Sequence, residues 1–116
     1  MVFDIYEKLK IDGKEYNLCF PVEQVARLES ELRSGNLLLT MLNMQNPDVL
    51  LSAGDFFALF KYALLGGGDA AEEDIPQLFL AAKYDHDDKE IAEVVASALR
   101  KSGLVGKPKK AKAAKA

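Results

Sequence analysis

The sequence predicts an α+β fold that is mainly α, with an N-terminal β-hairpin packed on a bundle of four to five helices. Residues 2–20 alternate between apolar and polar side chains around a turn sequence, a pattern typical of two antiparallel strands. In several segments between residues 22 and 101, apolar residues recur every three or four positions, as on one face of a helix. A chain of 116 residues has room for one domain, which we expect to occupy residues 1–106.

The hairpin is predicted from the pair Asp12-Gly13. Both central positions of a type I′ turn need a positive φ, and Asp-Gly is a preferred pair for them. Pairing about this turn sets Ile11 against Lys14, Leu9 against Tyr16 and Ile5 against Phe20. One face of the hairpin is then apolar. Helices must cover that face, because an isolated hairpin is only marginally stable in water.

Two helices are expected after the hairpin, over residues 22–33 and 37–44. The first has an apolar stripe with charged residues on its other sides, and Ser34-Gly35-Asn36 follows it as a stop signal. The second, LLLTMLNM, is a short apolar run. It suits either one or two helical turns or a buried extended segment, and its periodicity does not choose between them.

The most apolar segment, residues 48–65, is predicted to be the central helix. Nine of its last ten residues are apolar, and Lys61 is the exception. Phe57 and Leu65 fall beside Lys61 on a helical wheel, so they point outward unless the helix is wrapped on all sides. The segment is therefore either the buried centre of the bundle or a helix that offers a second apolar face to a partner. The triple glycine at 66–68 ends it.

The last two helices are expected over residues 73–84 and 88–101, on either side of an acidic turn. Pro76 suits the first turn of the former, where a missing N–H is harmless. The acidic turn is interpreted as a helix cap rather than a calcium loop, because Glu90 stands where such a loop needs glycine. The Lys/Ala-rich tail, residues 107–116, is expected to be disordered.

The charge distribution and the termini argue against nucleic acid and membranes as partners. Residues 1–106 carry ten Lys/Arg and eighteen Asp/Glu, and an acidic body repels phosphate. The five lysines of 107–116 are interpreted as a solubilising terminus. The N-terminus lacks the apolar core of a signal peptide, and charged residues interrupt the longest apolar stretch. Together with the single cysteine, Cys19, these features lead us to expect a cytoplasmic protein.

The sequence contains no recognisable catalytic or metal-binding motif. His86 is the only histidine, and no cysteine or serine stands next to it. The triple glycine lacks the lysine of a phosphate-binding loop. We therefore expect no enzymatic activity, no small-molecule substrate, no metal and no cofactor.

Five apolar residues are candidates for contact with a partner protein. They come from the Leu- and Met-rich run and from the outward side of the central helix: Leu38, Met41, Met44, Phe57 and Leu65. Methionine-rich surfaces adapt to varied partners, although the same residues also fill cores. The hypothesis is that these residues form a groove for amphipathic helices. Such a surface also favours self-association.

The order of these features resembles a known family. The segments KIDGKEYNLCF, PVEQVARLESEL and SALRKSGL, with Asn46-Pro47-Asp48 between the Leu-rich run and the aromatic helix, follow one another over about residues 9–104. This order resembles the small tail assembly chaperones of long-tailed, siphovirus-type bacteriophages and prophages.

The resemblance implies a non-enzymatic protein of tail morphogenesis in the cytoplasm of the bacterial host. The implied partner is the tape measure protein, which such chaperones keep soluble during tail tube assembly, with the tail tube protein as a second implied partner. Two alternatives stay open. One is a small nucleic-acid-associated regulator that uses the basic tail, and the other is a generic acidic adaptor or secretion chaperone.

Overall fold

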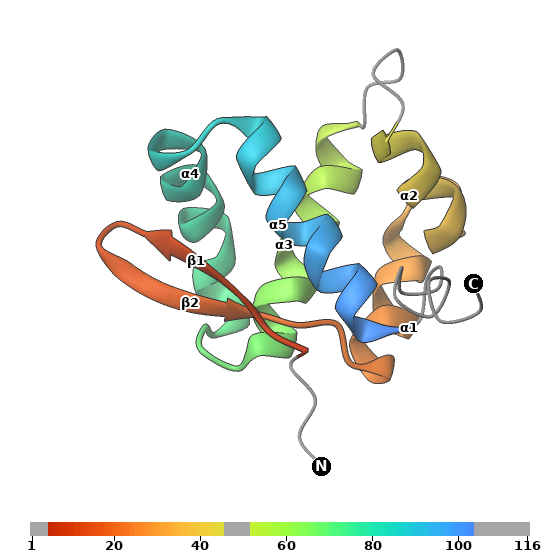
Figure 1. The fold of residues 1–116 in the computed structure, drawn as a ribbon, viewed down its shortest axis with the longest axis horizontal. Helices are drawn as coiled ribbons and strands as arrows, with labels where there is room; N and C mark the ends of the chain where they lie inside the picture. Colours follow the sequence, from red (N-terminus) through yellow and green to blue (C-terminus); the bar gives the residue numbers. More distant parts are fainter. Residues whose placement is uncertain (1–4, 46–51, 104–116) are drawn as a thin grey trace, which may run out of the picture.

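The structure, a computed structural model, describes residues 5–45 and 52–103. Within these ranges a two-stranded antiparallel hairpin is followed by five α-helices and a short 3-10 helix (Figure 1). The elements are β1 (Glu7–Ile11), β2 (Lys14–Leu18), α1 (Val22–Glu31), α2 (Leu37–Gln45), α3 (Ala53–Gly67), η1 (Glu72–Asp74), α4 (Ile75–Asp85) and α5 (Asp88–Ser102). The fold class predicted from the sequence, α+β and mainly α, is confirmed.

The hairpin turns at Asp12-Gly13, and both residues have the positive φ that a type I′ turn requires, 51° and 82°. Ile11 pairs with Lys14 and Leu9 with Tyr16, as predicted. The predicted pairing of Ile5 with Phe20 is wrong, since the ladder ends before both. The chain after β2 leaves the hairpin to bond with α3, where the Cys19 N–H donates to the Ala63 carbonyl at 3.0 Å.

Helix α3 is the centre of the bundle. Helices α1, α4 and α5 and strand β2 all contact it, and Figure 1 shows it behind α5, between α1 and α4. Its buried apolar residues are Phe56, Ala58, Leu59, Phe60, Tyr62, Ala63 and Leu64. Of the two alternatives that the sequence left open for this helix, the structure shows the buried centre.

The start of α3 differs from the prediction. The helix begins at Ala53 instead of residue 48, and residues 48–51 lie outside the described ranges. Ser52 caps it, because its Oγ accepts a hydrogen bond from the Asp55 N–H at 3.1 Å. Asp55 lies in the first turn, where a carboxylate suits the positive end of the helix dipole.

The glycines that end α3 have a packing role that their sequence signature did not reveal. A Cβ at Gly66 would come within 1.9 Å of the Cys19 carbonyl oxygen, and one at Gly67 within 1.8 Å of the Asn17 carbonyl oxygen. The last turn of α3 therefore lies directly on the backbone at the end of β2. Gly68, at φ 81°, then terminates the helix as predicted.

The acidic turn before α5 is a capping box, which confirms its interpretation as a helix cap. The Asp87 side chain accepts from the Glu90 N–H at 2.9 Å, and the Glu90 side chain accepts from the Asp87 N–H at 3.1 Å. His86 Nε2 lies 2.7 Å from the Lys10 carbonyl oxygen, so the same turn is tied to β1.

Candidate functional site

Helix α2 is a surface helix with two apolar sides. Its nine residues contain no charged side chain. Leu37, Thr40 and Met41 are buried on the inner side. Leu38, Leu39 and Leu42 on the outer side are 54%, 47% and 58% exposed. A surface helix normally carries polar residues outward, so three exposed leucines on an uncharged helix indicate a contact surface.

The first turn of α2 is fixed to α1 by a side chain of α1. Glu29 Oε2 accepts a hydrogen bond from the Leu37 N–H at 2.8 Å. Asn36 Oδ1 accepts a hydrogen bond from the Leu39 N–H at 3.0 Å, so Asn36 caps the start of α2. These bonds satisfy N–H groups that a helix start leaves without intrahelical partners, and they set the position of α2 relative to α1.

The segment between α1 and α2 is also tied to α3. Asp55 is buried, and its Oδ1 accepts a hydrogen bond from the Arg33 backbone N–H at 3.0 Å. This bond joins the chain just after α1 to the first turn of the central helix. The exposed leucines are therefore presented by a helix that the rest of the fold holds in place.

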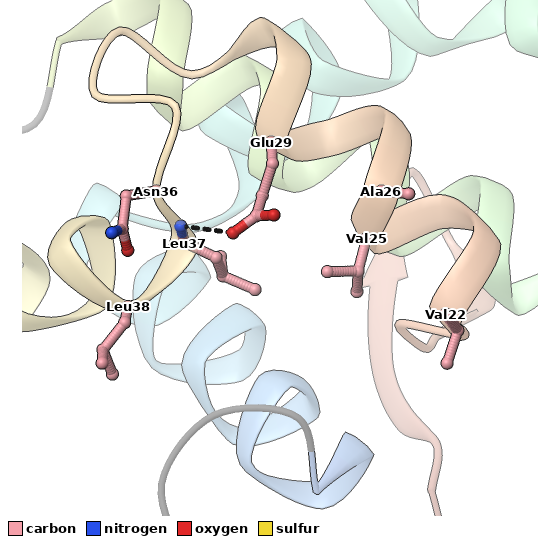
Figure 2. Close-up of a pocket in the computed structure, with 7 residues that line it drawn as sticks. All are labelled: Val22, Val25, Ala26, Glu29, Asn36, Leu37 and Leu38. Carbon is pink, nitrogen blue, oxygen red and sulfur yellow. Dashed lines mark hydrogen bonds between the residues drawn. The ribbon is translucent and has the colours of Figure 1, made fainter.

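A groove of ≈ 340 Å³ lies between α1 and α2. It is lined by Val22, Val25, Ala26, Glu29, Asn36, Leu37 and Leu38. Figure 2 shows Val25 and Leu37 pointing toward each other from the two helices. Val22, at the start of α1, is 65% exposed, so this end of the groove offers apolar surface to water. Below, "the α1–α2 surface" means this groove together with Leu39 and Leu42.

The sequence-predicted partner residues are not all at this surface. Leu38 is exposed and lines the groove. The prediction that Met41 contacts a partner is wrong, because its side chain is only 4% exposed and belongs to the core. Met44 lies on α2, but its side chain is outside the described part of the structure.

The prediction that Phe57 and Leu65 point outward is also wrong, since both side chains are partly buried against the core. The ring of Phe57 meets the ring of Phe79 from α4 edge-on, with centroids 5.1 Å apart. The expectation of an outward face assumed that Lys61 marks solvent. Its side chain is instead only 17% exposed and forms ion pairs with Glu31 and Glu72 on neighbouring elements.

Sequence reasoning missed Val22, Leu39 and Leu42 as surface residues. For Leu39 and Leu42 a signal existed, because a nine-residue helix without any charged residue cannot cover both of its sides in so small a protein. For Val22 there was none, since it continues the regular apolar stripe of α1.

A second pair of exposed apolar residues lies on α4, on the opposite side of the molecule from α2 (Figure 1). Leu80 is 65% exposed and Tyr84 is 93% exposed, one helical turn apart. Exposed apolar residues in ones and twos are ordinary on protein surfaces. This pair is therefore a control surface for experiments on α2.

Tyr62 is the centre of a polar cluster at the edge of the core. Its buried hydroxyl donates a hydrogen bond to Glu31. The cationic groups of Arg27 and Lys61 lie over its ring at 5.2 and 5.1 Å. Burial raises the pKa of Tyr62, and the hydrogen bond to Glu31 raises it further. This cluster links α1 to α3 from the side away from the groove.

A cleft of ≈ 440 Å³ between β1 and α5 is lined mostly by residues with polar side chains. Within it Ser97 Oγ donates to Glu7 at 2.5 Å, and Lys101 Nζ lies 3.0 Å from the same carboxylate. These contacts of Glu7 with Ser97 and Lys101 join β1 to α5. Among residues 5–45 and 52–103, no three His, Cys, Asp or Glu side chains gather as metal ligands. No helix in these ranges has both the length and the apolar character needed to cross a bilayer.

Comparison with known proteins adds no relative: no family model, curated protein or solved structure matches this chain.

Proposed function

We propose that this protein is a tail assembly chaperone of a long-tailed bacteriophage or prophage, which binds the tape measure protein in the host cytoplasm and keeps it soluble. The tail tube protein is a second proposed partner. The observation that carries the proposal is the outer side of α2, with three leucines exposed on a helix that has no charged residue. The order of sequence features that resembles these chaperones supports the same reading.

The size of the exposed surface suits a partner that must later be released. Fully burying a leucine contributes about 1.5 to 3 kcal/mol. Leu38, Leu39 and Leu42 are each about half exposed, so each has about 1 kcal/mol left to gain. Association costs several kcal/mol in lost freedom. The three leucines alone do not exceed this cost, so the client must also contact the groove between α1 and α2. A small surplus over the cost gives reversible binding, as a chaperone needs when tube subunits polymerise around its client.

The two alternatives make different demands on the chain. A nucleic-acid regulator would need a basic surface, whereas residues 5–45 and 52–103 together hold ten Lys/Arg and sixteen Asp/Glu. An adaptor or secretion chaperone would use the same apolar surface with another client. The identity of the bound protein therefore separates these functions.

The test is co-expression with the proposed client, the tape measure protein, followed by affinity capture. We expect capture by the wild-type chain, and a large loss of capture by the double variant Leu38→Glu, Leu42→Glu. Leu80→Glu is the control, since Leu80 is also exposed, at 65%, but lies on α4. Capture that Leu80→Glu abolishes and the double variant does not affect would contradict the proposed binding surface.

A further inference from the structure

The charge that lines the groove is negative. Among the described residues that line it, Glu29 is the one charged side chain. Glu23 is exposed beside Val22 at the start of α1. Arg27, the basic residue of α1, is turned away, because it pairs with Glu72 at 3.7 Å and lies over the ring of Tyr62.

The Glu29 carboxylate lies between the two helices. Figure 2 shows it on the α1 side of the groove, bonded to the first N–H of α2. An amide N–H orients a carboxylate but does not neutralise it, so a negative charge remains at the groove. No charged residue on α2 balances it, so the groove is acidic at Glu29, and Glu23 adds a second negative charge near the start of α1.

From this arrangement we infer that the α1–α2 surface binds an amphipathic helix whose apolar stripe is bordered by lysine or arginine on one side. The inference rests on the proposed function and names the class of client segment that it selects. The apolar side chains of such a helix would cover Val22, Val25 and Leu38, and its basic side chains would face Glu23 and Glu29. A length of about three turns matches α1 and α2.

Charge complementarity of this kind selects among apolar helices. A helix with an acidic border would bring like charges together at Glu23 and Glu29, which disfavours binding. The charges involved are exposed or half-buried, so salt screens them strongly. The basic-bordered helix should therefore bind more weakly as ionic strength rises, while the apolar contribution remains.

The experiment compares two helical peptides with the same leucine stripe, one bordered by lysine and the other by glutamate. Each carries a fluorophore and is titrated with the full chain while anisotropy is measured. We expect tighter binding of the lysine peptide, with an affinity that falls as salt is added. The double variant Glu23→Gln, Glu29→Gln should weaken that binding by about threefold to tenfold, since exposed ion pairs contribute modestly.

The controls separate charge from structure. Glutamine at position 29 keeps an oxygen acceptor for the Leu37 N–H, so α2 stays capped while the charge is lost. The double variant Glu73→Gln, Glu93→Gln removes two exposed acids on η1 and α5, and should leave binding unchanged.

Three results would overturn the inference. Equal binding of both peptides, still lost in Leu38→Glu, would refute charge selection and leave the proposed function standing. No binding of either peptide would count against the proposed surface itself. Tighter binding of the glutamate peptide than of the lysine peptide would reverse the predicted selection.

Discussion

Gly67 at the end of α3 lies against the backbone of Asn17 in β2, so closely that a Cβ at Gly67 would stand 1.8 Å from the Asn17 carbonyl oxygen. Asn17 is held from the other direction as well, because its backbone N–H and its side-chain amide both donate to Asp69 at 2.9 Å. The outer edge of β2 is thus covered by the end of α3 and the residues after it. This contact joins the hairpin to the helical bundle.

Replacing Gly67 with alanine should destabilise the fold. The contact is with backbone, which cannot turn aside as a flexible side chain can, and overpacking of this kind costs about 1 to 3 kcal/mol. Gly54→Ala is the matched control, because a Cβ there meets nothing within 4 Å and Gly54 lies in the first turn of the same helix. Alanine at that site should stabilise by about 0.4 to 1 kcal/mol. Urea unfolding followed by circular dichroism measures both, and equal stability of the two variants would refute the close contact.

Tyr62 should make the protein less stable at alkaline pH. Because its pKa is raised, the folded protein keeps the phenolic proton to a higher pH than the unfolded chain does. Above the ordinary tyrosine pKa of about 10, unfolding then releases a proton, and the free energy of unfolding falls as pH rises. Burial alone would lower the pKa of Lys61, but Tyr62, Glu31 and Glu72 raise it overall, so Lys61 acts in the same direction.

The variant Tyr62→Phe isolates this contribution. At neutral pH it should lose about 1 kcal/mol, the usual net value of one hydrogen bond. Above about pH 10 its stability should fall less steeply than that of the wild type. Parallel pH profiles for the two proteins, from denaturant unfolding at each pH, would contradict the role given to Tyr62.

The Cys19 thiol should react slowly in the native state. Its side chain is 3% exposed, and burial raises its pKa, so little reactive thiolate forms. Labelling by a maleimide should therefore follow opening of the joint between β2 and α3, and should be faster in Gly67→Ala than in the wild type. The double variant Cys19→Ala, Gln77→Cys gives the reference labelling rate of an exposed cysteine, because Gln77 is exposed. Native labelling as fast as that reference would show that the joint is open.

Local signals in the sequence were enough to predict most of the elements, although they left residues 37–44 open between a helix and an extended segment. Asp12-Gly13 fixed the hairpin turn because few residue pairs adopt two positive φ values. Gly68 marked the end of α3, and the acidic turn before α5 marked its capping box. Each of these signals acts within a few residues of the chain.

The candidate site depended on contacts between distant segments, which periodicity does not report. The position of Lys61 predicts a solvent-facing side of the central helix. Instead, Lys61 forms ion pairs with Glu31 and Glu72, and Phe79 of α4 packs on Phe57. Met41 and Leu38 stand in the same apolar run, and only the packing of α2 on α1 turns one inward and the other outward. Nothing in the spacing of the sequence indicated that Glu29 caps α2.

Hydrogen exchange of the full chain, alone and with the tape measure protein, tests the central claim most directly. If α2 offers its outer leucines to a client, amide exchange should slow in Leu37–Gln45 and at the start of α1 on binding. Exchange in α4, Ile75–Asp85, should stay unchanged. Slowed exchange in α4 with none in α2 would contradict the account, because the client would then lie on the opposite side of the molecule.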